Sequence, residues 1–162
     1  MRVGPVIVNN TPLGALWVLG RLDLLRELYD EVLIPQGVYE EFVATERTVR
    51  QAALGNAPWI RPVSLANPQR ARVYIGLDLG EAEVLALAEE RAARLVIIDE
   101  LRGRRHAQRP EMPLTGTLGL LLLAKERGLV ADLAPLLVEL QEAGLYLGAS
   151  LIDRVLRLAG EK

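Results

Sequence analysis

Short apolar runs alternate with longer segments of helical period along the whole chain. Three of these runs, Val6–Val8, Glu31–Ile34 and Leu95–Ile98, consist largely of Val, Ile and Leu and predict strands, and Met112–Thr115 predicts a shorter one. Strands without a polar face are buried on both sides, and helical segments separate them here. The pattern therefore predicts a three-layer α/β/α fold around a central parallel sheet.

Helical periodicity accounts for most of the remaining chain. The predicted helices are Pro12–Leu19, Leu22–Tyr29, Gly37–Thr45, Gly80–Ala93, Arg102–Gln108, Thr117–Arg127, Asp132–Ala143 and Ser150–Ala159. Residues 55–80 are the least regular stretch. A length of 162 residues suits one domain, so we expect residues 1–162 to form a single domain.

Composition narrows the possible chemistry. Hydrophobic residues make up 51% of the chain and aromatic residues 4%, which predicts a large aliphatic core. The absence of Cys excludes disulfides, thiolate zinc sites and cysteine nucleophiles. The one histidine, His106, is too few for a metal site built on two or three imidazoles.

Charge and hydropathy bear on partners and location. The 19 basic and 21 acidic side chains give a net charge of −2, so a nucleic acid would have to bind a local basic patch. The longest apolar stretch, Leu114–Ala124, is too short to span a membrane, and the N-terminal apolar run is broken by polar residues. We therefore expect a cytoplasmic protein with no membrane contact.

Polar residues follow two of the predicted strands. Asn10 comes after Val6–Val8, and Asp99 directly follows Leu95–Ile98. In parallel sheets ligands gather at the carboxyl ends of the strands, which makes both residues candidates for a site. An Asp in this position also serves as the cap of the next helix, and both interpretations stay open.

Two glutamates add to this acidic set. Glu81 shares a helix face with Val84 and Leu85, so it points to the buried side, where it needs a partner. Glu83 is rotated away from that face, and the helix dipole alone explains an acid in a first turn. Glu41 lies on the flank of the Val38–Phe42 stripe, where surface charge is the simpler explanation.

Convergence of Glu41, Glu81 and Asp99 beside Asn10 would require a cation. Carboxylates in one cleft repel each other, and a divalent ion neutralises them. An all-oxygen ligand set without histidine suits Mg²⁺ or Mn²⁺. Such an ion polarises a phosphoryl oxygen and lowers the pKa of a bound water, which is the chemistry of phosphodiester hydrolysis.

A basic segment begins three residues after Asp99. It contains four arginines and no acid in eight residues, namely Arg102, Arg104, Arg105 and Arg109. Guanidinium groups pair bidentately with phosphate, so this segment could hold a nucleic-acid backbone, with His106 as part of the same rim. A solvated helix face in an Arg-rich protein is the competing explanation.

The loop Thr115–Gly119 superficially resembles a phosphate-binding loop. It lacks the Gly-Lys-Ser/Thr of a P-loop and the dinucleotide-binding fingerprint. Thr117 is better explained as the N-cap of the next helix, while Thr115 or Thr117 could present a hydroxyl to the cleft. A nucleotide-binding α/β domain that uses this loop stays as a third interpretation.

The order of these segments resembles that of a PIN domain, nearest to the branch of PIN-like proteins predicted to bind nucleic acid. The resemblance covers nearly the whole chain and rests on seven segments in the correct order. They are VNNTPL (8–13), GRLDLL (20–25), IPQGVYEE (34–41), LGEAE (79–83), IIDE (97–100), GRR (103–105) and TGTLG (115–119).

The resemblance implies a parallel sheet of about five strands with an acidic metal site at the strand ends. Active members of the family are Mg²⁺- or Mn²⁺-dependent ribonucleases, and many bacterial ones are toxins inhibited by a small antitoxin. By position, the acidic residues of the family fall on Asn10, Glu41, Glu81 and Asp99, with Glu83 and Glu100 as further candidates.

Asn10 departs from the family pattern, because asparagine offers a carbonyl oxygen but neither charge nor basicity. We therefore expect either an endoribonuclease of toxin–antitoxin type or a nucleic-acid-binding module without cleavage. In the first, Glu41, Glu81 and Asp99 hold the ion, and the arginines and Thr115 contact RNA.

Possible protein partners are a small antitoxin or a second copy of the chain. The apolar helices Pro12–Leu19 and Asp132–Ala143 could bury surface in a homodimer or against an antitoxin peptide. Packing into the core of the protein itself explains the same leucines.

Overall fold

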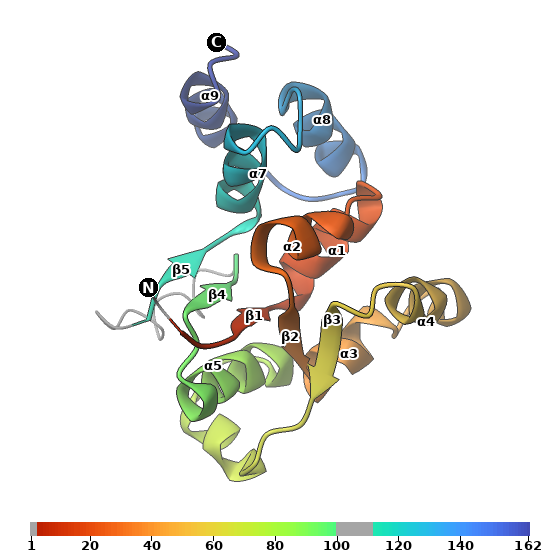
Figure 1. Cartoon of the computed structure of the whole chain (residues 1–162), viewed down its shortest axis with the longest axis vertical. Coiled ribbons are helices and arrows are strands. Elements are labelled where there is room, and N and C mark those ends of the chain that lie inside the picture. Colours follow the sequence, from red (N-terminus) through yellow and green to blue (C-terminus); the bar gives the residue numbers. More distant parts are fainter. Residues whose placement is uncertain (1–2, 100–111) are drawn as a thin grey trace.

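The computed structural model describes residues 3–99 and 112–162 and shows a five-stranded, all-parallel sheet (Figure 1). The strands are β1 (Val6–Val8), β2 (Val32–Pro35), β3 (Ile60–Val63), β4 (Leu95–Ile97) and β5 (Leu114–Thr115). Their order in the sheet is β3-β2-β1-β4-β5, and all four neighbouring pairs are parallel. The predicted three-layer α/β/α fold with a parallel sheet is confirmed.

β1 is the middle strand and fixes the register of the sheet. Val6 lies opposite Val32 of β2 and Leu95 of β4, and Val8 lies opposite Ile97. All three residues of β1 are fully buried. This explains their composition, since a strand covered on both faces has no place for a polar side chain.

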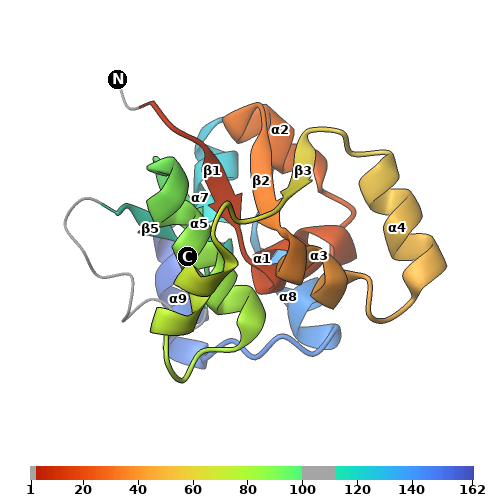
Figure 2. The same ribbon diagram turned by 90° about the horizontal axis from the view of Figure 1, so that it is seen from below.

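Helices cover both faces of the sheet. They are α1 (Asn10–Val18), α2 (Asp23–Tyr29), α3 (Gln36–Phe42), α4 (Arg47–Gly55), the 3₁₀ helix η1 (Pro68–Val73), α5 (Leu79–Arg91), α7 (Thr117–Glu126), α8 (Ala134–Glu142) and α9 (Ala149–Leu158). Figures 1 and 2 show α3 and α5 on one side of the sheet and α1, α2 and α7 on the other. The predicted helix Arg102–Gln108 lies outside the described residues.

The elements α4, β3 and η1 were not predicted, and α4 and β3 show why. β3 is an edge strand in which Arg61 and Pro62 are exposed, so its sequence has no apolar run. α4 buries only Leu54, and it begins after Glu46, whose φ of 48° is left-handed. Both elements owe their structure to the neighbours they pack on, because neither has a strong local pattern.

Arg50 of α4 packs on α1 and α3. Its guanidinium lies 4.5 Å from the ring centre of Trp17 and 4.9 Å from that of Phe42, and its Nη1 donates to the Phe42 carbonyl at 3.1 Å. Cation–π contacts of this kind stabilise a half-buried arginine. The two rings meet edge to face at 6.2 Å, so one cluster joins α1, α3 and α4.

The apolar helices serve the core of the protein itself. Leu13 and Leu16 of α1 are fully buried, and Leu137 and Leu140 of α8 are 1% exposed. These leucines therefore give no support to the predicted homodimer. None of the helices among residues 3–99 and 112–162 is long and apolar enough to cross a membrane.

Glu161, near the C-terminus, holds α7 and α8 together. Its carboxylate accepts the backbone N–H groups of Leu133 at 2.7 Å and Ala134 at 3.0 Å, at the start of α8. It also accepts Lys125 Nζ of α7 at 2.8 Å. Burial raises the pKa of this carboxyl, but the bonds from Leu133, Lys125 and Ala134 outweigh burial and lower the pKa to about 2.

This arrangement predicts a loss of stability in acid. Because the pKa of Glu161 is lower in the folded chain than its ordinary 4.5, its contribution is complete above about pH 4.5 and lost as the pH falls toward 2. We expect Glu161→Gln to lower the free energy of unfolding at pH 7 by on the order of 2 kcal/mol. Urea unfolding from pH 7 to pH 2 should show the two proteins converging in acid. The control Glu142→Gln, on the exposed side of α8, should change little, and a difference from wild type independent of pH would contradict this role.

Candidate functional site

The carboxyl ends of β2, β1, β4 and β5 lie along one edge of the sheet. α3 follows β2 and α1 follows β1 at this edge, while Asp99 and α7 follow β4 and β5. The Asn9 N–H donates to the Ile97 carbonyl at 2.9 Å and ties the end of β1 to the end of β4. Asn10 and Asp99 therefore follow adjacent strands at the edge where ligands gather.

Two asparagines follow β1, and the structure gives them different environments. Asn9 directly follows the strand, is 2% exposed and precedes α1 as its N-cap residue. Asn10 is the first residue of α1, and its buried Oδ1 has no hydrogen-bond partner among the described residues. Only Asn10 was predicted as a site residue, although Asn9 directly follows the strand and is as good a candidate by its position.

Glu81 lies at the start of α5 and is 2% exposed, as its helix face predicted. Its backbone N–H donates to Asp78 Oδ1 at 2.8 Å, and its Oε1 accepts the Asp78 N–H at 3.4 Å. This reciprocal pair is a capping box, which satisfies two of the free N–H groups at a helix start. The box holds the Glu81 side chain against the helix start, facing the interior.

Glu41 of α3 reaches the same place. Its Oε1 lies only 2.6 Å from the point that a Cβ on Gly80 would occupy, and Asp78 Oδ1 lies 3.6 Å from that point. The structure therefore brings the Glu41 carboxylate to the start of α5, at the residue that precedes Glu81. A glycine at position 80 gives the carboxylate of Glu41 the room it needs.

A second contact between the two helices mirrors the first. Glu83 of α5 reaches back to α3, where its Oε1 accepts the Gly37 N–H at 2.7 Å. A Cβ on Gly37 would lie 2.7 Å from the same oxygen. The helix dipole alone therefore does not explain Glu83, since this half-buried side chain holds the helix that carries Glu41. The signal in the sequence was that α3 follows Pro35, which supplies no side-chain cap.

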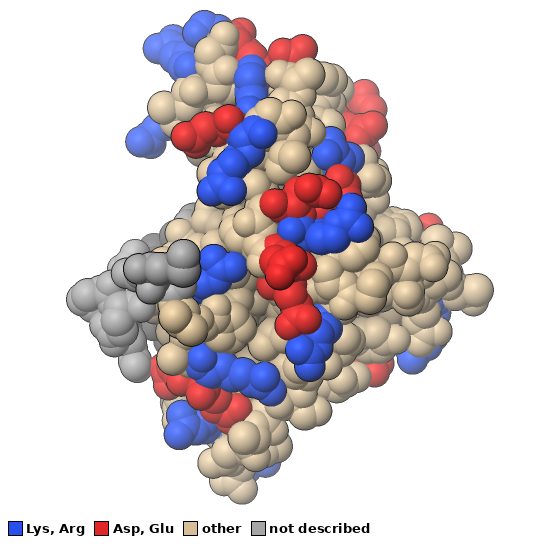
Figure 3. Space-filling model, viewed as in Figure 1, with Lys and Arg blue, Asp and Glu red and all other residues tan. Residues whose placement is uncertain are grey.

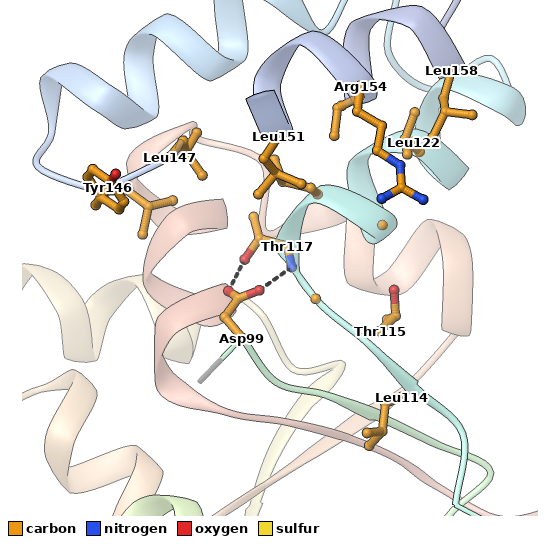
Figure 4. Close-up of a pocket in the computed structure, with 15 residues that line it drawn as sticks. Asp99, Leu114, Thr115, Thr117, Leu122, Tyr146, Leu147, Leu151, Arg154 and Leu158 are labelled. Carbon is orange, nitrogen blue, oxygen red and sulfur yellow. Dashed lines mark hydrogen bonds between the residues drawn. The ribbon is translucent and has the colours of Figure 1, made fainter. Parts of the chain in front are cut away.

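Asp99 is bound to the start of α7. The Thr117 N–H donates to Asp99 Oδ1 at 2.8 Å, and the Thr117 hydroxyl donates to Oδ2 at 2.5 Å (Figure 4). Thr117 is therefore not the N-cap of its own helix, as its sequence suggested; Gly116 occupies that position. A Cβ on Gly116 would lie 2.4 Å from Asp99 Oδ1, so this glycine lets the carboxylate approach the helix.

The predicted phosphate-binding arginines Arg102, Arg104, Arg105 and Arg109 lie outside the described residues. The same holds for Glu100 and His106. On the face shown in Figure 3, basic and acidic side chains are interspersed. The described surface in this view therefore carries no large field of one sign.

The described residues contain no group of three or more His, Asp and Glu side chains placed to hold a metal ion. The side chains of the predicted ligands Glu41, Glu81 and Asp99 nevertheless suit a hard divalent ion, because their donor atoms are all oxygens. The buried Oδ1 of Asn10, without a hydrogen-bond partner in the described part of the chain, is a further oxygen suited to such an ion. Each carboxylate oxygen accepts more than one bond, so the contacts with Thr117 orient Asp99 without excluding a ligand.

A pocket of about 590 Å³ opens beside Asp99 (Figure 4). Thr115 and Thr117 belong to its polar side, and leucines of α7, of α9 and of the segment before α9 form its apolar side. That Thr115 or Thr117 presents a hydroxyl to the acidic cleft stays a prediction. Asp99 lines this pocket, whereas Glu41, Glu81 and Asn10 do not.

The comparison with known families agrees with this architecture. A profile of the PIN-domain family matches residues 5–161. The chain belongs to the PIN-domain family. PIN domains have a nuclease-type fold, generally use divalent metals, and are associated with nucleic-acid binding. No curated protein and no solved structure matches the chain, and the branch of the family stays a prediction.

The contact between Glu83 and α3 leads to a prediction about stability. Glu83→Ala removes the acceptor of the Gly37 N–H, and we expect it to lower the free energy of unfolding by about 1 kcal/mol. Glu126→Ala, at the exposed end of α7, is the matched control and should stay within about 0.5 kcal/mol. Urea unfolding of both variants at pH 7 measures the difference, and equal midpoints for the two would contradict a capping role for Glu83.

Proposed function

We propose that this PIN-domain protein is a divalent-metal-dependent endoribonuclease, of the toxin type that a small antitoxin inhibits. One observation supports the proposal: Glu41 of α3 reaches Gly80 at the start of α5, next to the buried Glu81, at the edge of the sheet where Asn10 and Asp99 follow the central strands. Two acids placed together in this way repel each other, and a divalent ion removes that cost.

Glu41, Glu81 and Asp99 would hold Mg²⁺ or Mn²⁺, and the ion would supply the positive charge that polarises a phosphodiester. Asn10 would contribute its amide oxygen or orient the attacking water through it. Asn10 adds no charge, so we expect weaker binding of the ion than a fourth carboxylate would allow. The arginines 102, 104, 105 and 109, together with Thr115, would contact the phosphates of the RNA.

A non-catalytic nucleic-acid-binding module is the second candidate. It is favoured by Asn10 at the place of the first acid of the family, and by the lack of a three-carboxylate group within residues 3–99 and 112–162. This candidate keeps the fold and the contacts with nucleic acid but lacks cleavage.

Cleavage of a labelled RNA separates the two candidates. We expect the wild-type chain to cleave RNA with Mn²⁺ and to stop in EDTA, and Asp99→Asn to lower the rate by at least about 100-fold because the ion loses a charged ligand. Asp132→Asn, an exposed acid before α8, should cleave as wild type does. If wild type is inactive and Asn10→Asp gains cleavage, the chain is the binding module instead.

Gly80→Ala tests the role of the glutamate pair without removing a carboxylate. The new Cβ would lie 2.6 Å from Glu41 Oε1, so the flexible end of Glu41 must move away while the helix itself tolerates alanine. We expect an unchanged or slightly higher melting temperature and a fall in cleavage of about tenfold or more. Gly14→Ala in α1 makes the same change where no atom lies within 4 Å, and it should leave cleavage unaltered. If Gly80→Ala cleaves RNA as fast as the wild type does, Glu41 has no role in the site.

A further inference from the structure

The pocket beside Asp99 has two features that the nuclease chemistry leaves unexplained. Its walls come from β5, from α7, from α9 and from the segment that joins α8 to α9. Figure 1 shows α7 and α9 across the sheet from α3 and α5, which carry the glutamates. A volume of about 590 Å³ falls within the range of pockets that hold a small molecule or one unit of a polymer. One of the two features is a cation, and the other is an aromatic ring.

The cation is Arg154 of α9. It is exposed, and its guanidinium points from α9 toward the pocket (Figure 4). Arg154 forms no hydrogen bond or ion pair with any residue that the structure describes. The next arginine of the same helix, Arg157, instead pairs with Asp153 at 3.1 Å and does not line the pocket. A planar guanidinium beside a pocket and without a counter-ion suits a phosphate group.

The aromatic ring is Tyr146, in the segment before α9. It is 90% exposed, whereas the other six aromatic residues of the chain are buried or partly buried. In Figure 4 Tyr146 and Arg154 lie at opposite ends of the pocket, with Leu151 between them and Asp99 below. An exposed ring beside an apolar wall is a surface on which a nucleobase stacks, since every base has a flat face.

We propose that this pocket binds one nucleotide of the substrate RNA, with the base against Tyr146 and the leucine wall and a phosphate on Arg154. The inference rests on the proposed function for the nature of the substrate. A nucleotide uses the cation, the ring and the apolar wall at once, whereas an apolar peptide segment would leave Arg154 without a counter-ion. Asp99 lines the same pocket, so a strand seated here would lie beside it.

Binding of a short fluorescein-labelled single-stranded RNA, measured by anisotropy in EDTA, tests the pocket without any cleavage. We expect Arg154→Gln to weaken binding about tenfold and to reduce the slope of log K against log salt by about one, as for one lost phosphate contact. Tyr146→Ala should weaken binding at least about fivefold, and Tyr146→Phe should restore it because the stacking face remains. Arg157→Gln is the matched control for a lost surface charge and should stay within about twofold of wild type.

The results of these binding measurements also distinguish a failure of the proposed nucleotide pocket from a failure of the proposed nuclease activity. If Arg154→Gln and Tyr146→Ala bind RNA as tightly as wild type, or if Arg157→Gln loses as much as Arg154→Gln, the nucleotide pocket is wrong even when wild type cleaves RNA with Mn²⁺. If the chain binds no RNA in EDTA, a protein segment becomes the better occupant and the proposal falls. If binding depends on Arg154 and Tyr146 but no metal supports cleavage, the pocket stands and the proposed nuclease does not.

Discussion

Carboxylates crowded at one edge of a sheet need positive partners, and this fold supplies backbone N–H groups from helix starts. Asp99 accepts an N–H at the start of α7, Glu83 accepts one at the start of α3, and Asp78 accepts one at the start of α5. The N-terminus of a helix carries partial positive charge and unsatisfied donors, so each acid is stabilised where it lies. These N–H groups also set the directions of the Asp99, Glu83 and Asp78 side chains.

Glycines make these approaches possible. At Gly37, Gly80 and Gly116 a Cβ would lie 2.7, 2.6 and 2.4 Å from a carboxylate oxygen, closer than such contacts allow. Glu41 of α3 reaches Gly80 of α5 and Glu83 of α5 accepts the Gly37 N–H of α3, while Val38 also packs near Gly80. Movement of either helix would therefore move both glutamates, which links the packing of this layer to the geometry of the site.

Family membership and the particular residues of this chain have different consequences. The PIN fold accounts for a nuclease-type arrangement, in which parallel strands end at one edge beside acids from α3 and α5. Two neighbouring asparagines after β1 add no negative charge at that edge, so under the proposed function the affinity for a metal ion would depend on Glu41, Glu81 and Asp99. The pocket formed by α7 and α9 adds apolar and aromatic surface on the other side of Asp99, where a polymer substrate could be held by more than its phosphates.

The local pattern of the sequence determined the buried strands β1, β2 and β4, the positions of most helices and the inward face of Glu81, because periodicity and strand-end position depend on neighbours in the chain. It did not determine β3, because Arg61 and Pro62 have the local pattern of a loop and form a strand only by pairing with β2. It also did not reveal that Glu83 holds α3 or that Thr117 binds Asp99, contacts between residues 46 and 18 positions apart. Such contacts depend on how helices pack across the sheet, and a polar side chain with several possible acceptors or donors takes the one that packing brings within reach.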